Sequence, residues 1–270
     1  MIDTKLGQWL IYSIIAISVL IAGLTCFTLF AFIIKEGIVY FNLTFIVEMV
    51  PAMISTTYLV IITLLFACPI GFLTAIYLKL YAKSKIVTET ISFIINCLAA
   101  IPSIVYGLFA VSLFLYFFRI DRSIFIAGIT IGCLILPIII KNIEDAISNV
   151  SKLQIDASYA LGATTLYTIT RIILPNSIDR IVTILSLSIG RIVGDVAAIM
   201  FVMGTIDRIP NSIFDPGISL ATKLFLILQE PAFSNVGVGE AYAIALVLIL
   251  FIVLLNVIVK VTNYLLVKGD

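Results

Sequence analysis

The 270-residue sequence contains no histidine, and only 11% of its residues are charged. The absence of histidine excludes metal sites and general bases built on imidazole. So little charge, beside 62% hydrophobic residues, excludes a water-soluble domain of this length. The sequence therefore predicts a polytopic membrane protein. Its net charge of +1 points to neither nucleic acid nor an acidic partner surface.

Paired cysteines and nucleotide-binding loops are also lacking. Each of the four cysteines lies in an apolar stretch with no close neighbour of its kind: Cys26, Cys68, Cys97 and Cys133. This spacing indicates neither a metal motif nor a disulfide framework, so we interpret them as small buried hydrophobic residues. No Gly-x-x-x-x-Gly-Lys-Ser/Thr loop occurs. We therefore expect no metal, no cofactor and no ATPase site in this chain, and we do not expect it to be an enzyme.

Long apolar runs are what the sequence has in abundance. Six of them approach or exceed the ~20 residues that span a bilayer: 6–34, 49–78, 90–118, 123–140, 181–206 and 241–259. The fifth run carries two charges. The first is too long, and lacks the small-residue cleavage site, for a removable signal peptide. We predict an all-α integral membrane protein with six transmembrane helices and both termini on one side.

The basic residues indicate which side this is. With a cytoplasmic N-terminus, ten of them lie inside: Lys5, Lys79, Lys83, Lys85, Lys141, Lys152, Arg171, Arg180, Lys260 and Lys268. Five lie outside: Lys35, Arg119, Arg122, Arg208 and Lys223. The asymmetry follows the positive-inside rule and predicts cytoplasmic termini. It also places the segment between the fourth and fifth spans in the cytoplasm.

That cytoplasmic segment, residues 156–175, predicts a helix, a turn and a second helix. Ala157, Ala160 and Gly162 are small enough to let a short helix enter the groove of another protein. Gly162 can adopt a positive φ and end this helix. A second helix is then expected to be capped by Thr164 or Thr165 and stopped by Pro175.

The pattern resembles the EAA loop of ABC-importer permeases. In that family a Glu-Ala-Ala triplet, a Gly five residues after its second residue and a later Leu-Pro form a cytoplasmic coupling helix that docks on the ATPase. This sequence has Asp156 where Glu is usual and Ser158 where Ala is usual. The resemblance implies docking through Asp156, Ala157 and Gly162, within a coupling segment that includes Ala160 and Pro175. An amphipathic loop lying on the membrane surface is the alternative.

Two prolines lie within predicted spans. Pro69 and Pro102 lack an N–H group and crowd the preceding turn, so we expect helix breaks or kinks at both. A functional gate and a plain kink both remain open interpretations. The third span also places Ser103 and Tyr106 at membrane depth. Ser103 and Gly107, four residues apart, make a small face suited to close helix packing.

The stretch around Pro102 resembles the phosphate-specific importer permeases of the PstA and PstC type. It reads Ile-Pro-Ser-Ile-Val-Tyr-Gly-Leu-Phe, and the likeness continues at residues 136–140, 160–164 and 190–197. Residues 212–217 and 219–221 resemble the outer loop of the PstA-like member. The resemblance covers roughly residues 50–260. It implies a type I ABC importer permease of MetI-like architecture that translocates inorganic phosphate.

The fifth span carries the candidate transport chemistry. Arg191 and Asp195 are predicted to lie four apart on one helical face, where each charge costs ~2.5 to 3.5 kcal/mol. The Arg191 guanidinium can offer a bidentate fork to an oxyanion. The family's Gly-Arg-x-x-Gly-Glu segment implies a phosphate-pathway role for Arg191, although Asp195 replaces the usual Glu. Ser103 and Tyr106 are further pathway candidates, and a buried Arg–Asp pair that fixes helix register is the alternative.

Small residues recur at every fourth position beside this face: Ser186, Gly190, Gly194 and Ala198. Such a stripe suits a tight seam, either within the chain or against a second permease. Farther along, an apolar run at residues 220–228 is interrupted by Lys223 and is too short to cross a bilayer. We interpret it as an external or shallow helix, which contacts a solute-binding protein or simply packs over the other spans.

The sequence thus predicts an N-terminal helix and external loop at residues 1–48 and a core permease at 49–270, with the coupling loop near 142–180. The resemblance implies a heterodimer with a second, PstC-like permease, two ATPase subunits that bind ATP and Mg, and an external phosphate-binding protein. It also implies a bacterial or archaeal cytoplasmic membrane. Two alternatives stay open: a permease for molybdate or sulfate, and an ion-coupled secondary transporter that uses Asp195 as a proton carrier.

Overall fold

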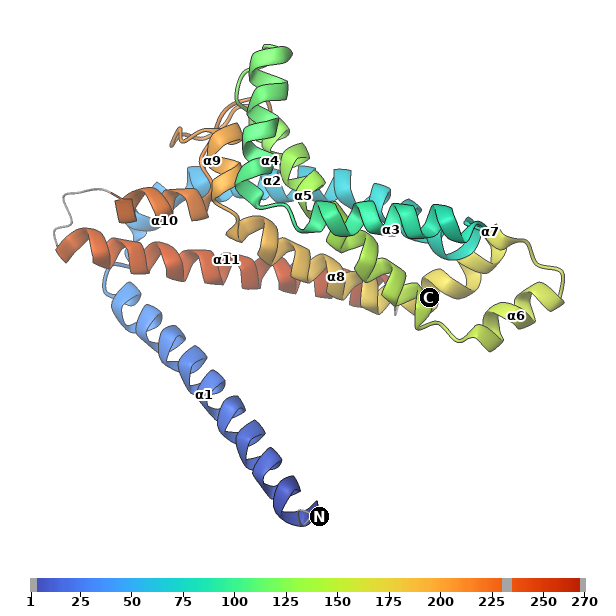
Figure 1. The fold of residues 1–270 in the computed structure, drawn as a ribbon. Helices are drawn as coiled ribbons and strands as arrows, with labels where there is room; N and C mark the ends of the chain where they lie inside the picture. Colours follow the sequence, from blue (N-terminus) through green and yellow to red (C-terminus); the bar gives the residue numbers. More distant parts are fainter. Residues whose placement is uncertain (1–3, 230–234, 268–270) are drawn as a thin grey trace.

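The computed structural model describes residues 4–229 and 235–267, and within these ranges the regular structure is entirely helical (Figure 1). The elements, with π-helical segments labelled η, are α1 (Thr4–Ile38), α2 (Leu43–Ile76), η1 (Tyr77–Tyr81), α3 (Lys85–Ala99), α4 (Ser103–Ala110), η2 (Val111–Phe117), α5 (Ile124–Ser148), α6 (Lys152–Ala160), α7 (Thr165–Thr168), η3 (Ile169–Ile173), α8 (Leu174–Gly194), α9 (Ala197–Met203), α10 (Leu220–Gln229) and α11 (Asn235–Val267). Five runs are long and apolar enough to cross a membrane, and a bent pair makes a sixth if it counts as one span.

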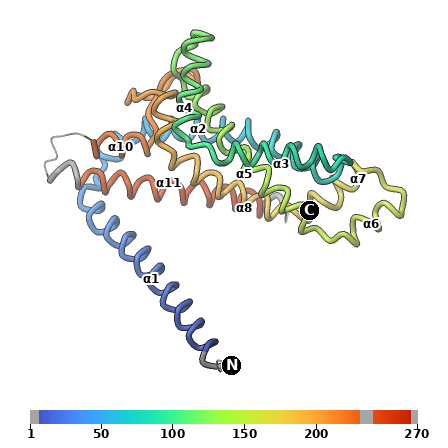
Figure 2. The backbone as a smooth tube through the Cα atoms, viewed as in Figure 1, coloured from blue at the N-terminus to red at the C-terminus, as the bar shows by residue number. Residues whose placement is uncertain are grey.

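The centre of the fold is the pair α2 and α5, against which α8 also packs. The two helices approach closely because α5 presents glycines to bulky side chains of α2. A Cβ added at Gly128 would lie 2.5 Å from Cγ2 of Ile62, and one at Gly132 would lie 2.5 Å from Cδ1 of Phe66. Small residues at such contacts let helix backbones come together in a membrane. Figure 2 shows α2, α3, α5, α8 and α11 running side by side as one body.

The third predicted span is not one straight helix. α3 ends at Ala99, and α4 begins at Ser103 after a bend of 93°. Pro102 lies at this bend in an extended conformation, with φ −60° and ψ 142°. Proline disfavours the helical conformation in the residue before it, which separates the two helices here. The predicted break at Pro102 is therefore present, and residues 90–118 form a bent pair of helices instead of one straight span.

The helix at Pro69 behaves differently. Pro69 lies inside α2, whose helical conformation continues without interruption from Leu43 to Ile76. The expected helix break at Pro69 is therefore absent, and a kink there stays a prediction. A transmembrane helix tolerates an internal proline when neighbouring helices support the turn that loses its hydrogen bond, and α5 and α8 pack along α2.

The helix α1 is the least covered element. It projects away from the other helices and meets them only towards its end, where Phe32 stacks edge-on against Tyr242 of α11 at 5.2 Å (Figure 1). At Gly37 a Cβ would lie 2.8 Å from the carbonyl oxygen of Tyr242, so glycine permits this crossing. The rest of α1 is exposed apolar surface, including Trp9 at 73%. In a membrane this surface faces lipid or another subunit.

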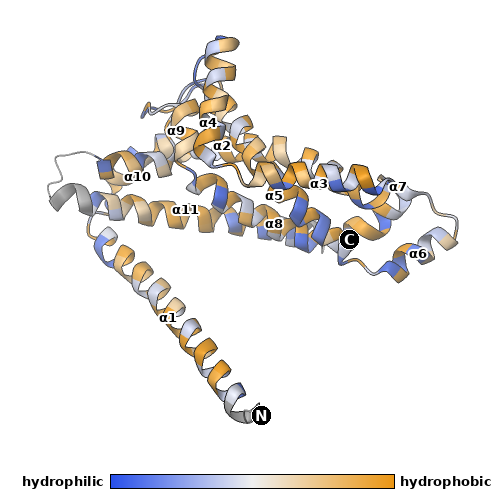
Figure 3. Ribbon diagram, in the orientation of Figure 1, coloured by the Kyte–Doolittle hydropathy of each residue, from blue (hydrophilic) through white to orange (hydrophobic). Residues whose placement is uncertain are grey.

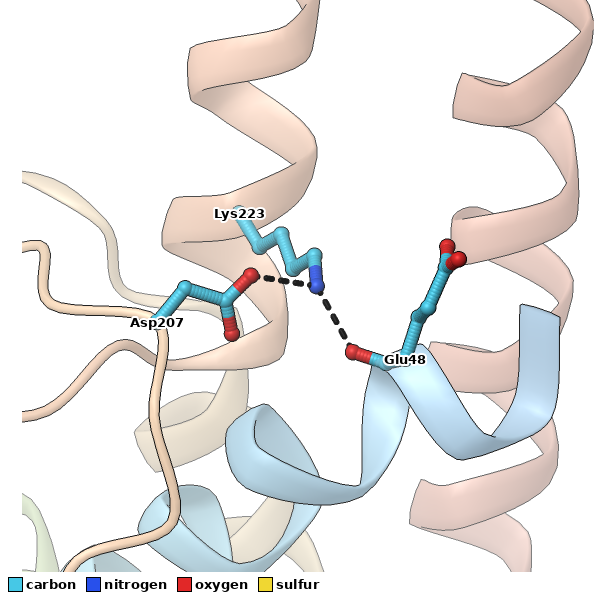
Figure 4. A network of polar contacts seen from close by, with 3 residues as sticks. All are labelled: Glu48, Asp207 and Lys223. Atoms are coloured by element: carbon cyan, nitrogen blue, oxygen red, sulfur yellow. Dashed lines mark hydrogen bonds and ion pairs between the residues drawn. The ribbon is translucent and has the colours of Figure 1, made fainter. Parts of the chain in front are cut away.

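The short helix α10 is tied to the bundle by Lys223. Its ammonium donates to the Asp207 carboxylate at 2.7 Å and to the Glu48 carbonyl oxygen at 2.8 Å (Figure 4). The Lys223 side chain is only 12% exposed, whereas Asp207 is 42% exposed. Lys223, which interrupts the apolar run at 220–228, therefore joins α10 to the loop before it and to the start of α2.

Candidate functional site

An uncovered polar stripe follows one face of α8 (Figure 3). Arg180, Thr183, Leu187 and Arg191 recur at intervals of three or four residues, and all four are exposed. The opposite face is buried and includes Ile189 and Ile192. α8 is therefore amphipathic in a protein whose other spanning helices are predominantly apolar, so this stripe requires a polar environment, such as a pathway or a partner.

The structure separates Arg191 from Asp195. α8 ends at Gly194, and Asp195 is extended, with φ −77° and ψ 131°. The Oδ1 atom of Asp195 accepts the N–H of Ala198 at 3.1 Å, in the first turn of α9. The expected pair on one helical face is therefore corrected: within the described residues Arg191 has no ion pair or hydrogen bond, and the Asp195 carboxylate caps the next helix.

The small-residue stripe is left open on α8. A Cβ added at Gly190 or Gly194 would meet nothing within 4 Å. Ala198 belongs to α9 and packs against Gly107 of α4, where a Cβ on Gly107 would lie 2.9 Å from Cα of Ala198. Gly190 and Gly194 thus form no seam within the described chain, while the close packing predicted for Gly107 is present.

The two pathway candidates on α4 lie at the bend. The Tyr106 hydroxyl donates to the carbonyl oxygen of Leu98 at 3.0 Å and so joins α4 to the end of α3. Ser103 begins α4 and is half-buried. The Tyr106 hydrogen bond therefore supports the bent conformation. Within the described residues, no hydrogen bond joins Ser103 or Tyr106 to Arg191.

The predicted helix, turn and helix lie at one end of the bundle as α6, a turn and α7 (Figure 2). Gly162 follows α6 with φ 81°. Its N–H bonds the carbonyl oxygen of Tyr159 at 2.9 Å, and the N–H of Ala163 bonds that of Ser158 at 3.1 Å. These two bonds form a Schellman motif, which requires the left-handed conformation that glycine adopts without strain. The Thr164 hydroxyl oxygen accepts the N–H of Tyr167 and caps α7, as predicted.

A buried hydroxyl pair joins α6 to α7. The Ser158 Oγ and Thr168 Oγ1 atoms lie 2.9 Å apart, and Thr168 also donates to the Thr164 carbonyl oxygen at 3.1 Å. Because a hydroxyl carries one proton, Ser158 is the donor to Thr168. Sequence reasoning noted Ser158 as a departure from the family pattern and missed Thr168. Their ten-residue separation gives no local signal, since the contact exists only after the turn forms.

Pro175 does not stop the second helix. α7, η3 and α8 form one continuous helical run from Thr165 to Gly194, with Pro175 at the start of α8. The π segment η3 directly precedes the proline, and such wider turns absorb an extra residue or a missing hydrogen bond. The expectation of a stop at Pro175 is corrected, and the consequence is a direct helical connection from α7 to Arg191.

The surface around α6 is open and largely apolar. A hollow of about 820 Å³ lies between α6 and the following helical run and is lined by Ala157, Gly162 and Arg171 among others. Leu153 and Leu161 are 81% and 90% exposed. Asp156 and Ala160 are also exposed, and Asp156 has no ion pair within the described residues. Exposed leucines of this kind on a short helix mark a protein-contact surface.

A second cluster on the α8 stripe was missed. Asn142 and Asp145 of α5 line a hollow of about 250 Å³ with Arg180 and Thr183 of α8. The spacing of Arg180 and Arg191, eleven residues or about three helical turns apart, was the available signal. It places both guanidinium groups on the same face of α8.

Comparison with known protein families gives a match over residues 67–269. The matching family is described as binding-protein-dependent transport system inner membrane component. The chain is 32% identical over 216 residues to a phosphate transport system permease protein PstA homolog of Mycoplasma pneumoniae, covering 76% of this chain and 33% of that protein. It is 30% identical to the phosphate transport system permease protein PstC of Haemophilus influenzae, covering 73% of this chain and 69% of the relative. It is 30% identical to PstA of Mycobacterium leprae, covering 73% and 64%.

The chain therefore spans a third of the Mycoplasma relative and about two thirds of the other two. Among solved structures, it is similar to a bacterial ABC transporter involved in the import of the acidic polysaccharide alginate, with a TM-score of 0.69, 16% identity and coverage of 96% of both chains. It is also similar to the inward-facing MetNI methionine ABC transporter, with a TM-score of 0.60, 15% identity and coverage of 85% and 99%. At these identities the likeness concerns the fold alone, and it confirms the predicted MetI-like architecture.

Proposed function

Because the chain belongs to the family of binding-protein-dependent transport system inner membrane components, we propose that it is the permease subunit of an ATP-driven importer for inorganic phosphate. It is a multi-pass membrane protein and a transport component. The substrate rests on the relatives, whose names include phosphate transport in both the PstA and PstC types. The alignments with these relatives cover about three quarters of this chain.

The observation that carries the proposal is the uncovered helix α6, held by the Schellman turn at Gly162 and by the Ser158–Thr168 hydroxyl pair. Its exposed leucines and small residues suit the groove of an ATPase. In the proposed complex Asp156, Ala157 and Ala160 contact that ATPase. The termini and α6 then lie in the cytoplasm, in agreement with the distribution of basic residues.

A mechanical connection runs from α6 to the proposed pathway. Movement of α6 is passed to α7 through Ser158 and Thr168, and α7 continues through η3 into α8. α8 carries Arg191 on its uncovered face. Closure of the ATPases would therefore tilt α8. The bend at Pro102 would let α4 move independently of α3.

Arg191 is the proposed phosphate contact. Its guanidinium has no partner within the described residues, so it is available to bind an oxyanion through a bidentate fork. Asp195 acts beside it as the cap of α9 and keeps α8 and α9 at a fixed junction. Arg180 and Thr183 lie farther along the same face and continue the polar stripe.

The remaining exposed surfaces suit the proposed partners. The face of α1 and the open glycines Gly190 and Gly194 suit a second, PstC-like permease, because small residues permit close helix packing in a membrane. The Lys223-linked helix α10 suits an external phosphate-binding protein. Two ATPase subunits that bind ATP and Mg complete the proposed complex, in a bacterial or archaeal cytoplasmic membrane.

ATP hydrolysis by the reconstituted complex tests the substrate. We expect phosphate, presented with the external binding protein, to stimulate hydrolysis, whereas molybdate and sulfate leave it at the basal rate. Stimulation by molybdate or sulfate alone would assign the permease to another oxyanion. Uptake that persists without the ATPase would instead support an ion-coupled secondary transporter.

A further inference from the structure

A second charged pocket lies at the opposite end of the bundle from α6. It has a volume of about 730 Å³ and lies between the segment after η2 and the loop that joins α9 to α10. Arg119, Asp121 and Arg122 line it from the first segment, and Asp215 lines it from the loop. The proposed transport pathway uses none of these residues.

The two arginines of this pocket are unpaired within the described residues, although two carboxylates are near. The Oδ2 atom of Asp215 accepts the N–H groups of Asn211 at 2.9 Å and of Ser212 at 3.1 Å. These bonds join the Oδ2 atom of the carboxylate to the backbone of its own loop. Asp121 is exposed and makes no ion pair within the same residues. The pocket is therefore lined by two permanently charged guanidinium groups and two carboxylates, and neither guanidinium forms an ion pair with them within the described residues.

The backbone holds Arg119 in a strained conformation. Its φ of 56° is the only positive value among the described residues other than glycine. Hydrogen bonds on either side fix this geometry: Phe118 N–H to the Leu113 carbonyl oxygen at 3.0 Å, and Ile120 N–H to that of Phe114 at 2.9 Å. Strain of this kind persists only where the surroundings maintain it, and it concentrates at ligand-binding positions.

Three exposed aromatic residues precede the arginines. Tyr116, Phe117 and Phe118 are 78%, 76% and 54% exposed. Aromatic side chains at the end of a membrane-inserted helix lie at the level of lipid headgroups, and arginines beside them bind phosphate oxygens. The position of the pocket thus suits a phosphate-type oxyanion.

We propose that Arg119 and Arg122 together bind a phosphate-class oxyanion in this pocket, supplied either by an anionic lipid headgroup or by free inorganic phosphate. The two guanidinium forks would each donate to phosphate oxygens, with Asp121 and Asp215 limiting occupancy to one anion at a time. The proposal does not depend on transport, because it concerns only occupancy of this pocket.

Chemical labelling of arginine by phenylglyoxal, read out residue by residue with mass spectrometry, tests the proposal. The assembled complex is labelled in maltoside detergent, in the same detergent with inorganic phosphate, and in phosphatidylglycerol nanodiscs in phosphate-free buffer. Arg208, exposed in the α9–α10 loop and outside the pocket, is the internal reference. Chloride at equal ionic strength controls for screening.

We expect labelling of Arg119 and Arg122 to fall several-fold relative to Arg208 when the anion is present. Protection by inorganic phosphate in detergent identifies the free ion, and protection only in phosphatidylglycerol identifies the headgroup. The variant Arg119→Gln should lose protection of Arg122, whereas Arg208→Gln, compared with its own labelling in detergent alone, should retain it. Equal labelling of all three arginines in every condition, or arginines already unreactive in detergent alone, would overturn the proposal.

Discussion

Asp195 stands where α8 ends, and its carboxylate accepts the Ala198 N–H at the start of α9. This bond satisfies a backbone donor that the helix start would otherwise leave free at membrane depth, where water does not compete for it. The same arrangement leaves the Arg191 guanidinium without an internal partner in the described chain. At the residue scale, Asp195 therefore stabilises the start of α9, and Arg191 is available to bind an anion.

Substitutions of Asp195 distinguish its role as a helix cap from any role of its negative charge. Asp195→Ala removes the acceptor and should destabilise the protein by about 1 kcal/mol, whereas Asp195→Asn retains an oxygen that can cap α9. Thermal unfolding of the purified complex measures the difference. Transport should survive in Asp195→Asn. Equal loss of stability and transport in both variants would mean that the negative charge, and not the cap, is required.

At the scale of single elements, α6 depends on one backbone conformation. Gly162 adopts φ 81°, and a Cβ there would meet nothing within 4 Å. A substitution therefore acts through backbone strain and not through a clash, at a cost of roughly 1 to 2 kcal/mol. Besides this turn, α6 is joined to the bundle by the Ser158–Thr168 contact and by Ile155, which packs against the core. We therefore expect strain at the turn to alter the orientation of α6.

The turn at Gly162 yields a prediction about coupling. Gly162→Val should lower the amount of phosphate transported per ATP hydrolysed, because a β-branched residue does not tolerate this conformation. Gly162→Asn is the matched control, since asparagine adopts the left-handed conformation more readily and should retain more coupling. Parallel assays of uptake and hydrolysis in the reconstituted complex give the ratio. A wild-type ratio in Gly162→Val would show that α6 does not need this turn.

The contact between α4 and α9 yields another prediction. Gly107→Ala would place its Cβ 2.9 Å from Cα of Ala198, so one of the two helices must shift. Overpacking of this kind costs about 1 to 3 kcal/mol. Ser103→Ala, on the same helix, should be nearly neutral because the Ser103 side chain makes no hydrogen bond within the described residues. Unfolding temperatures that rank these variants in the opposite order would refute the packing account.

At the scale of the whole molecule, the features predicted from sequence are those set by local chemistry. Apolar length predicted the first, second, fourth and sixth spans, whereas the fifth, predicted at 181–206, is the helical run Thr165–Gly194. Glycine predicted the turn at Gly162, and a threonine hydroxyl predicted the cap at Thr164. Each depends on a residue and its immediate neighbours. The family resemblance extended this to the MetI-like fold.

The features that sequence did not predict depend on how the chain compensates for a local defect. Pro102 separates two helices as predicted, whereas Pro69 and Pro175 lie within continuous ones, where packing or the π segment η3 absorbs the missing hydrogen bond. The end of α8 at Gly194 follows from the cap that Asp195 gives to α9. The partner of Lys223, Asp207, becomes evident only when the loop has folded back on α10.

Phosphate uptake into vesicles that contain the complex, with and without the ATPase, tests the central claim most directly. Wild type is compared with Arg191→Ala, with Arg191→Lys, which keeps the charge but not the fork, and with Arg208→Ala as the matched control. We predict ATPase-dependent uptake that is lost in Arg191→Ala, reduced in Arg191→Lys and unchanged in Arg208→Ala, with the complex assembled in every case. Uptake without the ATPase, or undiminished uptake in Arg191→Ala, would contradict an importer that moves phosphate past Arg191.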